Sequence, residues 1–133
     1  MAIYGYQITR AFTSGCDFRN HQYTMVAAGS VAGEVTGILT VNASTLGVLQ
    51  NDPNVGEEAT VCLYGLTKIY TDCENSSSPL TYGGLVKTAS GGRAMGTVIT
   101  ATGSINIAGI ALEAVTSGSG RCIEMFYTGT HLS

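Results

Sequence analysis

The chain has 133 residues, which fits a single domain able to bury roughly two-thirds of its unfolded surface without metal or disulfide staples. Charged residues make up only 11% of it, well below the roughly 25% of an average protein, so part of the surface is expected to be covered by another molecule. Six Lys or Arg against nine Asp or Glu give a net charge of −3. The scattered basic residues form no stripe for a phosphate backbone, so no nucleic-acid partner is expected.

The N-terminal residues lack the basic start and the long apolar run of a secretion signal, because Gly5 and Gln7 interrupt them. No stretch approaches the length of a membrane span. Synthesis in a cytoplasm, with no membrane partner, is therefore the expectation.

Residues 1–15 are considered apart from residues 16–133, which are expected to form the main domain. Two interpretations stay open for the first segment: Ile3–Thr9 is a first strand, or it is an arm that orders on a partner by pairing at a sheet edge. The segment holds aromatic and arginine residues of the kind that protein interfaces favour, and these are candidate contacts: Tyr4, Tyr6, Arg10 and Phe12.

Runs rich in Thr, Val, Ile and Tyr recur between the 18 glycines, which predicts an all-β fold. We expect a compact single domain of β-sandwich or barrel-like form, with many short strands and little helix. The apolar Ala59, Val61 and Leu63 alternate with Thr60 and Cys62, as in a strand with two different faces. The predicted strands are Gln22–Ala27, Gly37–Val41, Ala59–Ile69, Gly84–Thr88, Gly96–Thr102, Ile105–Leu112 and Cys122–Tyr127.

Turn and loop signals separate these runs. The paired glycines of Ser90–Arg93 predict a two-residue hairpin turn, and Ser117–Gly120 is expected to form another before the last strand. Asn51–Asn54 predicts a turn in which proline fixes φ. The polar tract Thr71–Pro79 predicts a surface loop, and Asn42–Gln50 has room for one short turn of helix at most.

The four cysteines show no C-x-x-C spacing and only two histidines accompany them, so no metal site is predicted. Cys62 and Cys122 lie in strand-like runs and are expected to be buried free thiols. A Cys62–Cys73 bridge across a hairpin stays open, and it would require oxidation after cell lysis.

Catalytic patterns are missing from the sequence. There is no G-x-S-x-G elbow, and Cys16 lies five residues from His21 without an orienting partner. Glu57 and Glu58 are adjacent, so in a strand their carboxylates point to opposite faces and cannot act as an acid–base couple. We therefore predict no catalytic residue, no cofactor and no small-molecule substrate, and expect that the chain is not an enzyme.

Several segments resemble, in the right order, motifs of the capsid cement or decoration proteins of tailed phages. Asp17–Val26 is similar to the family's D-(apolar)-x-x-x-Q-Y-x-x-V opening. Gly47–Pro53 followed by Gly56–Val61 is similar to its G-V-L-Q-N-x-P-x-x-G-E-x-A-x-V core. Two weaker matches follow, Gly83–Thr88 to a G-D-L-V-K strand, with Gly84 where an acidic residue is common, and Gly109–Ala114 to a G-x-A-L-E-A segment.

The resemblance implies a structural virion protein, made in the host cytoplasm, that binds the outer surface of the capsid and stabilises or decorates it. Its implied partners are the major capsid protein and itself, as a homotrimer at or near three-fold positions. The turn residues are further candidate contacts, although the alternative is a fold-defining turn that touches no partner. These turn residues are Gln50, Asn51, Asp52 and Pro53.

Two other classes of function stay open. One is a carbohydrate-binding head-fibre or adhesin module on the virion surface, for which tyrosines would line the sugar site, although the chain has no Trp. The other is a hydrolase, which would require the fold to bring a nucleophile, a base and oxyanion donors together.

Overall fold

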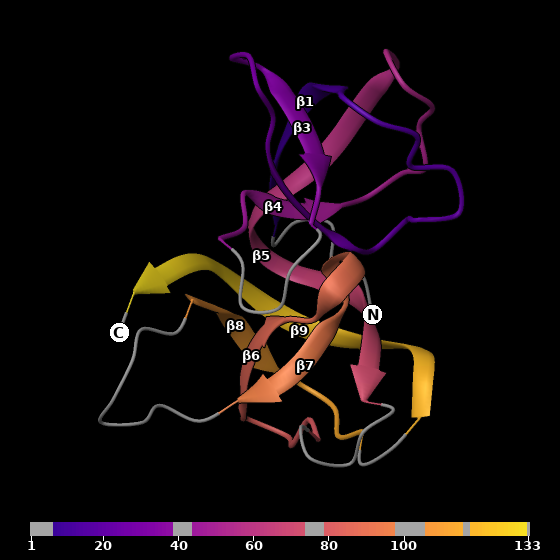
Figure 1. Cartoon of the computed structure of the whole chain (residues 1–133). Coiled ribbons are helices and arrows are strands. Elements are labelled where there is room, and N and C mark those ends of the chain that lie inside the picture. The colour runs from indigo at the N-terminus through magenta and orange to yellow at the C-terminus, as the bar shows by residue number, and fades with distance from the viewer. Residues whose placement is uncertain (1–6, 39–43, 74–78, 98–105, 116–117, 133) are drawn as a thin grey trace.

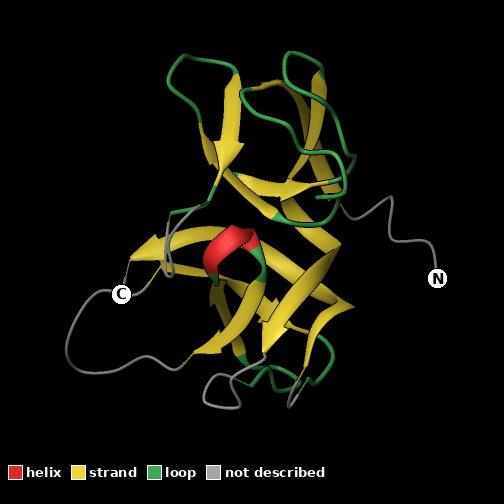
Figure 2. Ribbon diagram, turned by 45° about the vertical axis from the view of Figure 1, so that its right-hand side comes forward, coloured by secondary structure: helices red, strands yellow, loops and turns green. Residues whose placement is uncertain are grey.

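The structure is a computed structural model, and it describes residues 7–38, 44–73, 79–97, 106–115 and 118–132. Within these residues the chain forms nine strands and one 3₁₀ turn, η2 (Ser90–Gly92), so the predicted all-β fold with little helix is confirmed (Figure 2). The strands are β1 (Gln7–Ser14), β2 (Met25–Ala28), β3 (Glu34–Gly37), β4 (Gly47–Leu49), β5 (Glu58–Cys73), β6 (Leu85–Thr88), β7 (Ala94–Thr97), β8 (Asn106–Ala111) and β9 (Gly118–Leu132).

The nine strands form a single sheet that closes on itself twice. Their order is β1-β3-β2-β4-β5-β7-β6-β8-β9, and the additional pairings β1–β5 and β5–β9 close two five-stranded rings that share β5. Ring one contains β1 to β5 and lies above ring two, which contains β5 to β9, in the view of Figure 1. Closure removes the exposed edges that an open sheet would present to other chains.

Strand β5 can serve both rings because it is 16 residues long, whereas strands usually have 3–10 residues. Its partners change at Gly65, which pairs with Gln7 at one end of β1 and with Tyr127 of β9. Gly65 has a φ of 121°, a conformation that side chains disfavour. Ala59 and Val61, which precede Gly65, pack into the core of ring one, and Ile69, which follows it, packs into that of ring two.

Each ring has its own apolar core. The core of ring one contains Phe18, Val26, Val35, Leu49, Ala59 and Val61. The larger core of ring two includes Ile69, Leu80, Val86, Ile123, Met125 and Tyr127. Met25, Val48 and Cys62 come from ring-one strands but pack into this second core, because alternate residues of a strand point to opposite faces. These three side chains hold the two rings together.

The β6–β7 hairpin also joins the rings, through its η2 loop. Gly91 donates its N–H to the carbonyl of Ile38 (3.0 Å). Gly92 has a φ of 79°, and a Cβ added there would lie 2.2 Å from the carbonyl oxygen of Met25. The predicted hairpin at 90–93 is confirmed with positive φ at both glycines, but its loop is a 3₁₀ turn and not a two-residue turn.

Three further predictions from the sequence differ from the structure. Gly47–Leu49 is strand β4, not a helical turn, because it pairs with both β2 and β5 inside ring one. Residues 118–120 belong to β9, not to a turn, because Gly118 and Ser119 pair with Cys73 and Asp72 of β5. The same pairing places Thr71–Cys73 in β5 and not in a loop; the rest of that loop, 74–78, lies outside the described residues.

For the cysteines, one alternative left open is excluded and one prediction is wrong. Cys62 is buried and free, as expected, and this excludes the Cys62–Cys73 bridge in this structure. Cys122 is free but exposed. The reason is the alternation of β9, in which Ile123 and Met125 point into the core and Cys122 points outward.

Candidate functional site

The candidate turn between β4 and β5 is held by its own side chains. The side-chain amide of Asn51 donates to the carbonyl of Glu58 (3.0 Å) and accepts from the N–H of Thr60 (3.0 Å). It therefore pairs with β5 in the way that the backbone of a neighbouring strand would. Pro53 is buried, and its carbonyl accepts from the N–H of Phe18 (2.9 Å). Asp52, in contrast, is exposed.

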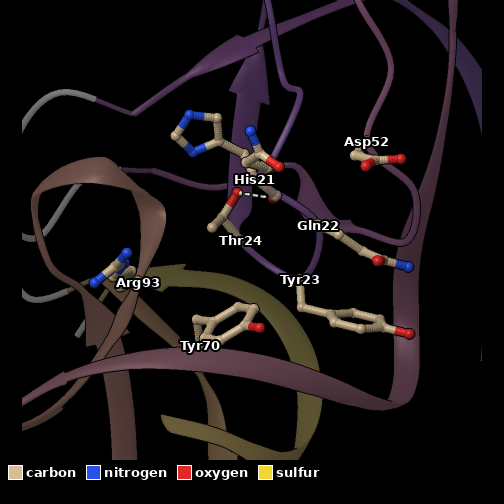
Figure 3. Close-up of a pocket in the computed structure, with 8 residues that line it drawn as sticks. His21, Gln22, Tyr23, Thr24, Asp52, Tyr70 and Arg93 are labelled. Carbon is tan, nitrogen blue, oxygen red and sulfur yellow. Dashed lines mark hydrogen bonds between the residues drawn. The ribbon is translucent and has the colours of Figure 1, made fainter. Parts of the chain in front are cut away.

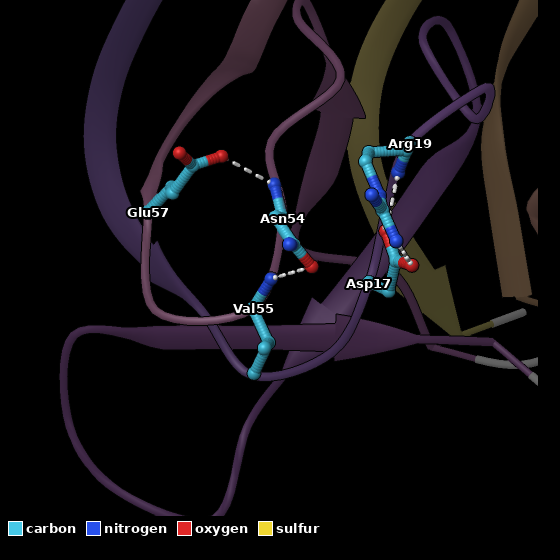
Figure 4. A network of polar contacts seen from close by, with 5 residues as sticks. All are labelled: Asp17, Arg19, Asn54, Val55 and Glu57. Atoms are coloured by element: carbon cyan, nitrogen blue, oxygen red, sulfur yellow. Dashed lines mark hydrogen bonds and ion pairs between the residues drawn. The ribbon is translucent and has the colours of Figure 1, made fainter.

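Glu57 and Asn54 complete this loop, as Figure 4 shows. The Glu57 carboxylate accepts from the N–H of Asn54 (2.7 Å), and the side-chain oxygen of Asn54 accepts from the N–H of Val55 (2.8 Å). Nearby, two bonds from the Arg19 guanidinium to Asp17 (2.9 and 2.7 Å) help to lower the pKa of that carboxyl from 3.8 to about 2. These carboxylates therefore stabilise loops.

Gln50 lies at the centre of a polar network between the rings. Its side-chain amide donates to Thr67 Oγ1 (2.8 Å) and to the carbonyl of Val48 (3.0 Å). Its backbone carbonyl accepts from the side-chain amide of Gln22 (2.8 Å), and its side-chain oxygen accepts from Gln7 (3.3 Å). Gln50 is thus occupied by contacts within the chain.

The N-terminal candidates fall into two groups. Tyr4 and Tyr6 lie outside the described residues. Arg10 and Phe12 lie on β1, which pairs with β3 and β5 as a full member of ring one. The exposed Arg10 guanidinium lies 4.9 Å from the centre of the half-buried Phe12 ring, a cation–π contact that leaves the arginine open to solvent.

A pocket of about 430 Å³ opens where the two rings meet, and we call it the seam pocket. Ring one contributes the β1–β2 loop and Asp52, and ring two contributes Tyr70 of β5 and Arg93 beside η2 (Figure 3). The residues that line it are Asn20, His21, Gln22, Tyr23, Thr24, Asp52, Tyr70 and Arg93. Of the candidate contacts that the structure describes, only Asp52 lines this pocket.

The backbone beneath the pocket is fixed in an uncommon conformation. Asn20 and Tyr23 both have a φ of 66°, which is unusual for a residue as bulky as tyrosine. Tyr23 donates its N–H to the carbonyl of Leu49 (2.8 Å), and its own carbonyl accepts from the N–H of Tyr70 (2.9 Å). The β1–β2 loop is therefore bonded to both rings, which holds its side chains in place.

A smaller, mostly apolar pocket of about 160 Å³ adjoins the seam pocket and shares His21 and Thr24 with it. Cys16 and His21 both line this smaller pocket, but among the described residues no hydrogen bond joins the thiol to the imidazole. In the part of the chain that the structure describes, no three His, Cys, Asp or Glu side chains gather to hold a metal ion. No helix in that part is long and apolar enough to cross a membrane.

The free thiols give a direct check of the fold. Burial raises the pKa of Cys62, and partial desolvation raises that of Cys122 although the residue as a whole is exposed, so at neutral pH both are in the thiol form, which reacts slowly. We expect a disulfide reagent to label the exposed Cys122 in the native protein, at a rate that rises with pH. Cys62 should react only after unfolding. Mass spectrometry of labelled peptides measures both rates, and equal labelling of the two in the native protein would contradict this fold.

Comparisons with known proteins bear on this architecture. No family model matches the chain, and no curated protein matches it. Among solved structures, the chain is similar to the N-terminal base of head fibre gp8.5 of bacteriophage phi29, with a TM-score of 0.62 and 15% sequence identity. The match covers 96% of this chain and 98% of that one. The two chains share one fold.

Sequence reasoning missed the seam pocket. Its residues come from four stretches of sequence that only ring closure and the η2 loop bring together. The one available signal was the polar tract at 20–24, which was interpreted as part of a family motif. The neighbouring Arg93 carried only the signal of a turn.

Proposed function

We propose that this chain is a structural, non-enzymatic protein of a phage virion, seated on the outer surface of the capsid. The observation that carries the proposal is the whole-length likeness to a phage head fibre base. The order of cement-like motifs in the sequence supports the same location independently.

Two forms of this role are proposed. The cement-like motifs favour a decoration protein that stabilises the shell, and the fold likeness favours the base of a head fibre. Both forms have the major capsid protein as partner and require one surface that adheres to the shell. A homotrimer at three-fold positions is the arrangement that the cement resemblance implies.

An exposed apolar row on the outer face of the sheet is the surface we propose for this contact, and we call it the belt. Ile8 of β1 pairs with Tyr64 of β5, and Phe126 of β9 pairs with Ile110 of β8. The rings of Tyr64 and Phe126 meet edge to face at 5.3 Å, so the row is continuous across four strands. Ile8 is 61% exposed and Tyr64 is 48% exposed.

The belt has the character of a protein contact surface. Large apolar groups that adjoin one another in this way mark interaction sites, and a central tyrosine is a common energetic anchor. The chain as a whole has few charges, so apolar contact is the chemistry it has most to offer. Binding of this kind is expected to survive moderate salt, because screening weakens ion pairs and not apolar contacts.

Replacing Tyr64 with serine is therefore expected to weaken binding to capsids that lack this protein by roughly tenfold or more. Val55→Ser is the control, because Val55 is 60% exposed in the loop before β5, which lies at the end of β1 and β5 opposite Ile8 and Tyr64. Co-sedimentation with purified capsids measures the affinity, and circular dichroism checks that each variant folds.

Absence of binding by the unaltered protein would remove the proposed role. Equal binding by both variants would remove the belt from the contact. Sedimentation of the free protein shows whether the belt also joins copies of the chain: a trimer that Tyr64→Ser dissociates would assign the belt to self-association instead.

A further inference from the structure

The seam pocket has the dimensions and chemistry of a small-ligand site. Its volume of about 430 Å³ falls within the roughly 300–1,000 Å³ that such sites occupy. Polar side chains from both rings line it, as Figure 3 shows.

Arg93 provides the most specific feature. Its side chain is half-buried and lines the pocket, yet among the described residues its guanidinium has no ion pair or hydrogen bond. Partly buried charged side chains are usually paired, because a charged group that loses its hydration and gains no partner costs free energy. A planar guanidinium in this position suits a carboxylate, which it can hold with two parallel hydrogen bonds.

Asp52 lies on the opposite side of the pocket from Arg93 (Figure 3). Its exposed carboxylate can only accept hydrogen bonds when ionised, so it suits a ligand that presents hydroxyl groups there. The same negative charge disfavours a ligand that is anionic over its whole surface, such as a free phosphate. The pocket therefore suits a ligand with an anionic end and a hydroxylated end.

Two tyrosines, Tyr23 and Tyr70, form the wall between these charges (Figure 3). Each offers an apolar ring face and a hydroxyl that can donate or accept, which matches the mixed surface of a sugar ring. The bond from the Tyr70 N–H to the Tyr23 carbonyl (2.9 Å) ties the two residues together. The uncommon backbone conformation of Tyr23, held from both rings, fixes the wall before any ligand arrives.

We propose that the seam pocket binds an acidic saccharide unit, meaning a sugar ring that carries one carboxylate. Arg93 pairs with the carboxylate, Tyr23 and Tyr70 contact the ring, and Asp52 accepts from its hydroxyl groups. Such units end or interrupt many cell-surface glycans, so a protein on a particle surface would gain an adhesive function from the site. The inference goes beyond the proposed virion role and does not rest on it.

Titration of the purified protein with N-acetylneuraminic acid and with glucuronic acid, followed by NMR shifts of its amides, tests the proposal. Saturable binding is expected, with shifts confined to residues around the pocket, and neutral glucose should bind at least tenfold more weakly. Arg93→Met should lower the affinity for the acidic sugars by roughly tenfold or more, since hydrogen bonds to charged groups are among the stronger ones. Arg121→Met is the matched control, because Arg121 is exposed on β9 outside the pocket.

A second pair of variants tests the tyrosine wall. Tyr70→Phe keeps the ring and should retain most of the affinity, whereas Tyr70→Ala should lose roughly tenfold, provided that the amide spectrum shows a folded protein. No saturable binding of either acidic sugar at millimolar concentration would overturn the proposal. Equal affinity of Arg93→Met and Arg121→Met, or equal affinity for acidic and neutral sugars, would overturn it as well. None of these outcomes bears on capsid binding, which is measured separately.

Discussion

Replacing Ile69 with alanine is expected to lower the free energy of unfolding by about 2–5 kcal/mol, because the side chain is fully buried on the shared strand β5. The loss combines the transfer of fewer apolar atoms with the cavity left among the neighbouring side chains. Urea unfolding followed by circular dichroism measures it. Ile8→Ala is the matched control, and it should change stability by about 0.5 kcal/mol or less since Ile8 is 61% exposed.

The same experiment tests whether the rings unfold together. Both rings contain β5, so loss of packing in ring two should destabilise ring one, and a single cooperative transition is expected for the protein and the variant. Two separated transitions, with only the second shifted by Ile69→Ala, would show that the rings are independent units.

Gly92→Ala is expected to cost about 2–5 kcal/mol, which is the sum of two effects. The first is the positive φ of 79°, which an alanine adopts only with strain. The second is a Cβ that would lie 2.2 Å from the carbonyl oxygen of Met25, a backbone atom of strand β2 in the other ring. Thermal unfolding measures the change.

Gly91→Ala separates these two effects. Gly91 has a φ of 83° but nothing within 4 Å of an added Cβ, so its substitution carries the conformational cost alone, about 1–2 kcal/mol. An equal loss for the two variants would mean that the close contact between η2 and β2 contributes nothing to stability.

The strand class of the fold could be predicted from the sequence because alternation is a local signal. Ala59, Val61 and Leu63 share a face in the structure, as do Ile123 and Met125, as the pattern indicates. The same pattern would have placed Cys122 outside, but its position within an apolar run was interpreted as burial. Local signals also failed at β4, which has three residues and owes its strand conformation to two neighbours.

The ring closures and the seam pocket could not be predicted from the sequence, for a different reason. The pairing of Gln7 with Gly65 joins residues far apart in the sequence, and nothing in either segment specifies the other. Arg93 faces the pocket only because η2 docks against β2, and Tyr70 faces it only because β5 continues past Gly65 into ring two. Sequence patterns predict which residues form strands and turns, but not which surfaces those elements bring together.

The central claim is the proposal that the chain belongs to the surface of a phage capsid, and cryo-electron microscopy of virions whose genome carries its gene tests this most directly. Maps of virions with and without the gene are compared, and mass spectrometry of the same particles reports whether the protein is present. The account predicts density for the two-ring fold at repeated positions on the outer shell, with the belt against the capsid, and its loss when the gene is deleted. Identical shells in the two maps, with the protein missing from purified virions, would contradict it.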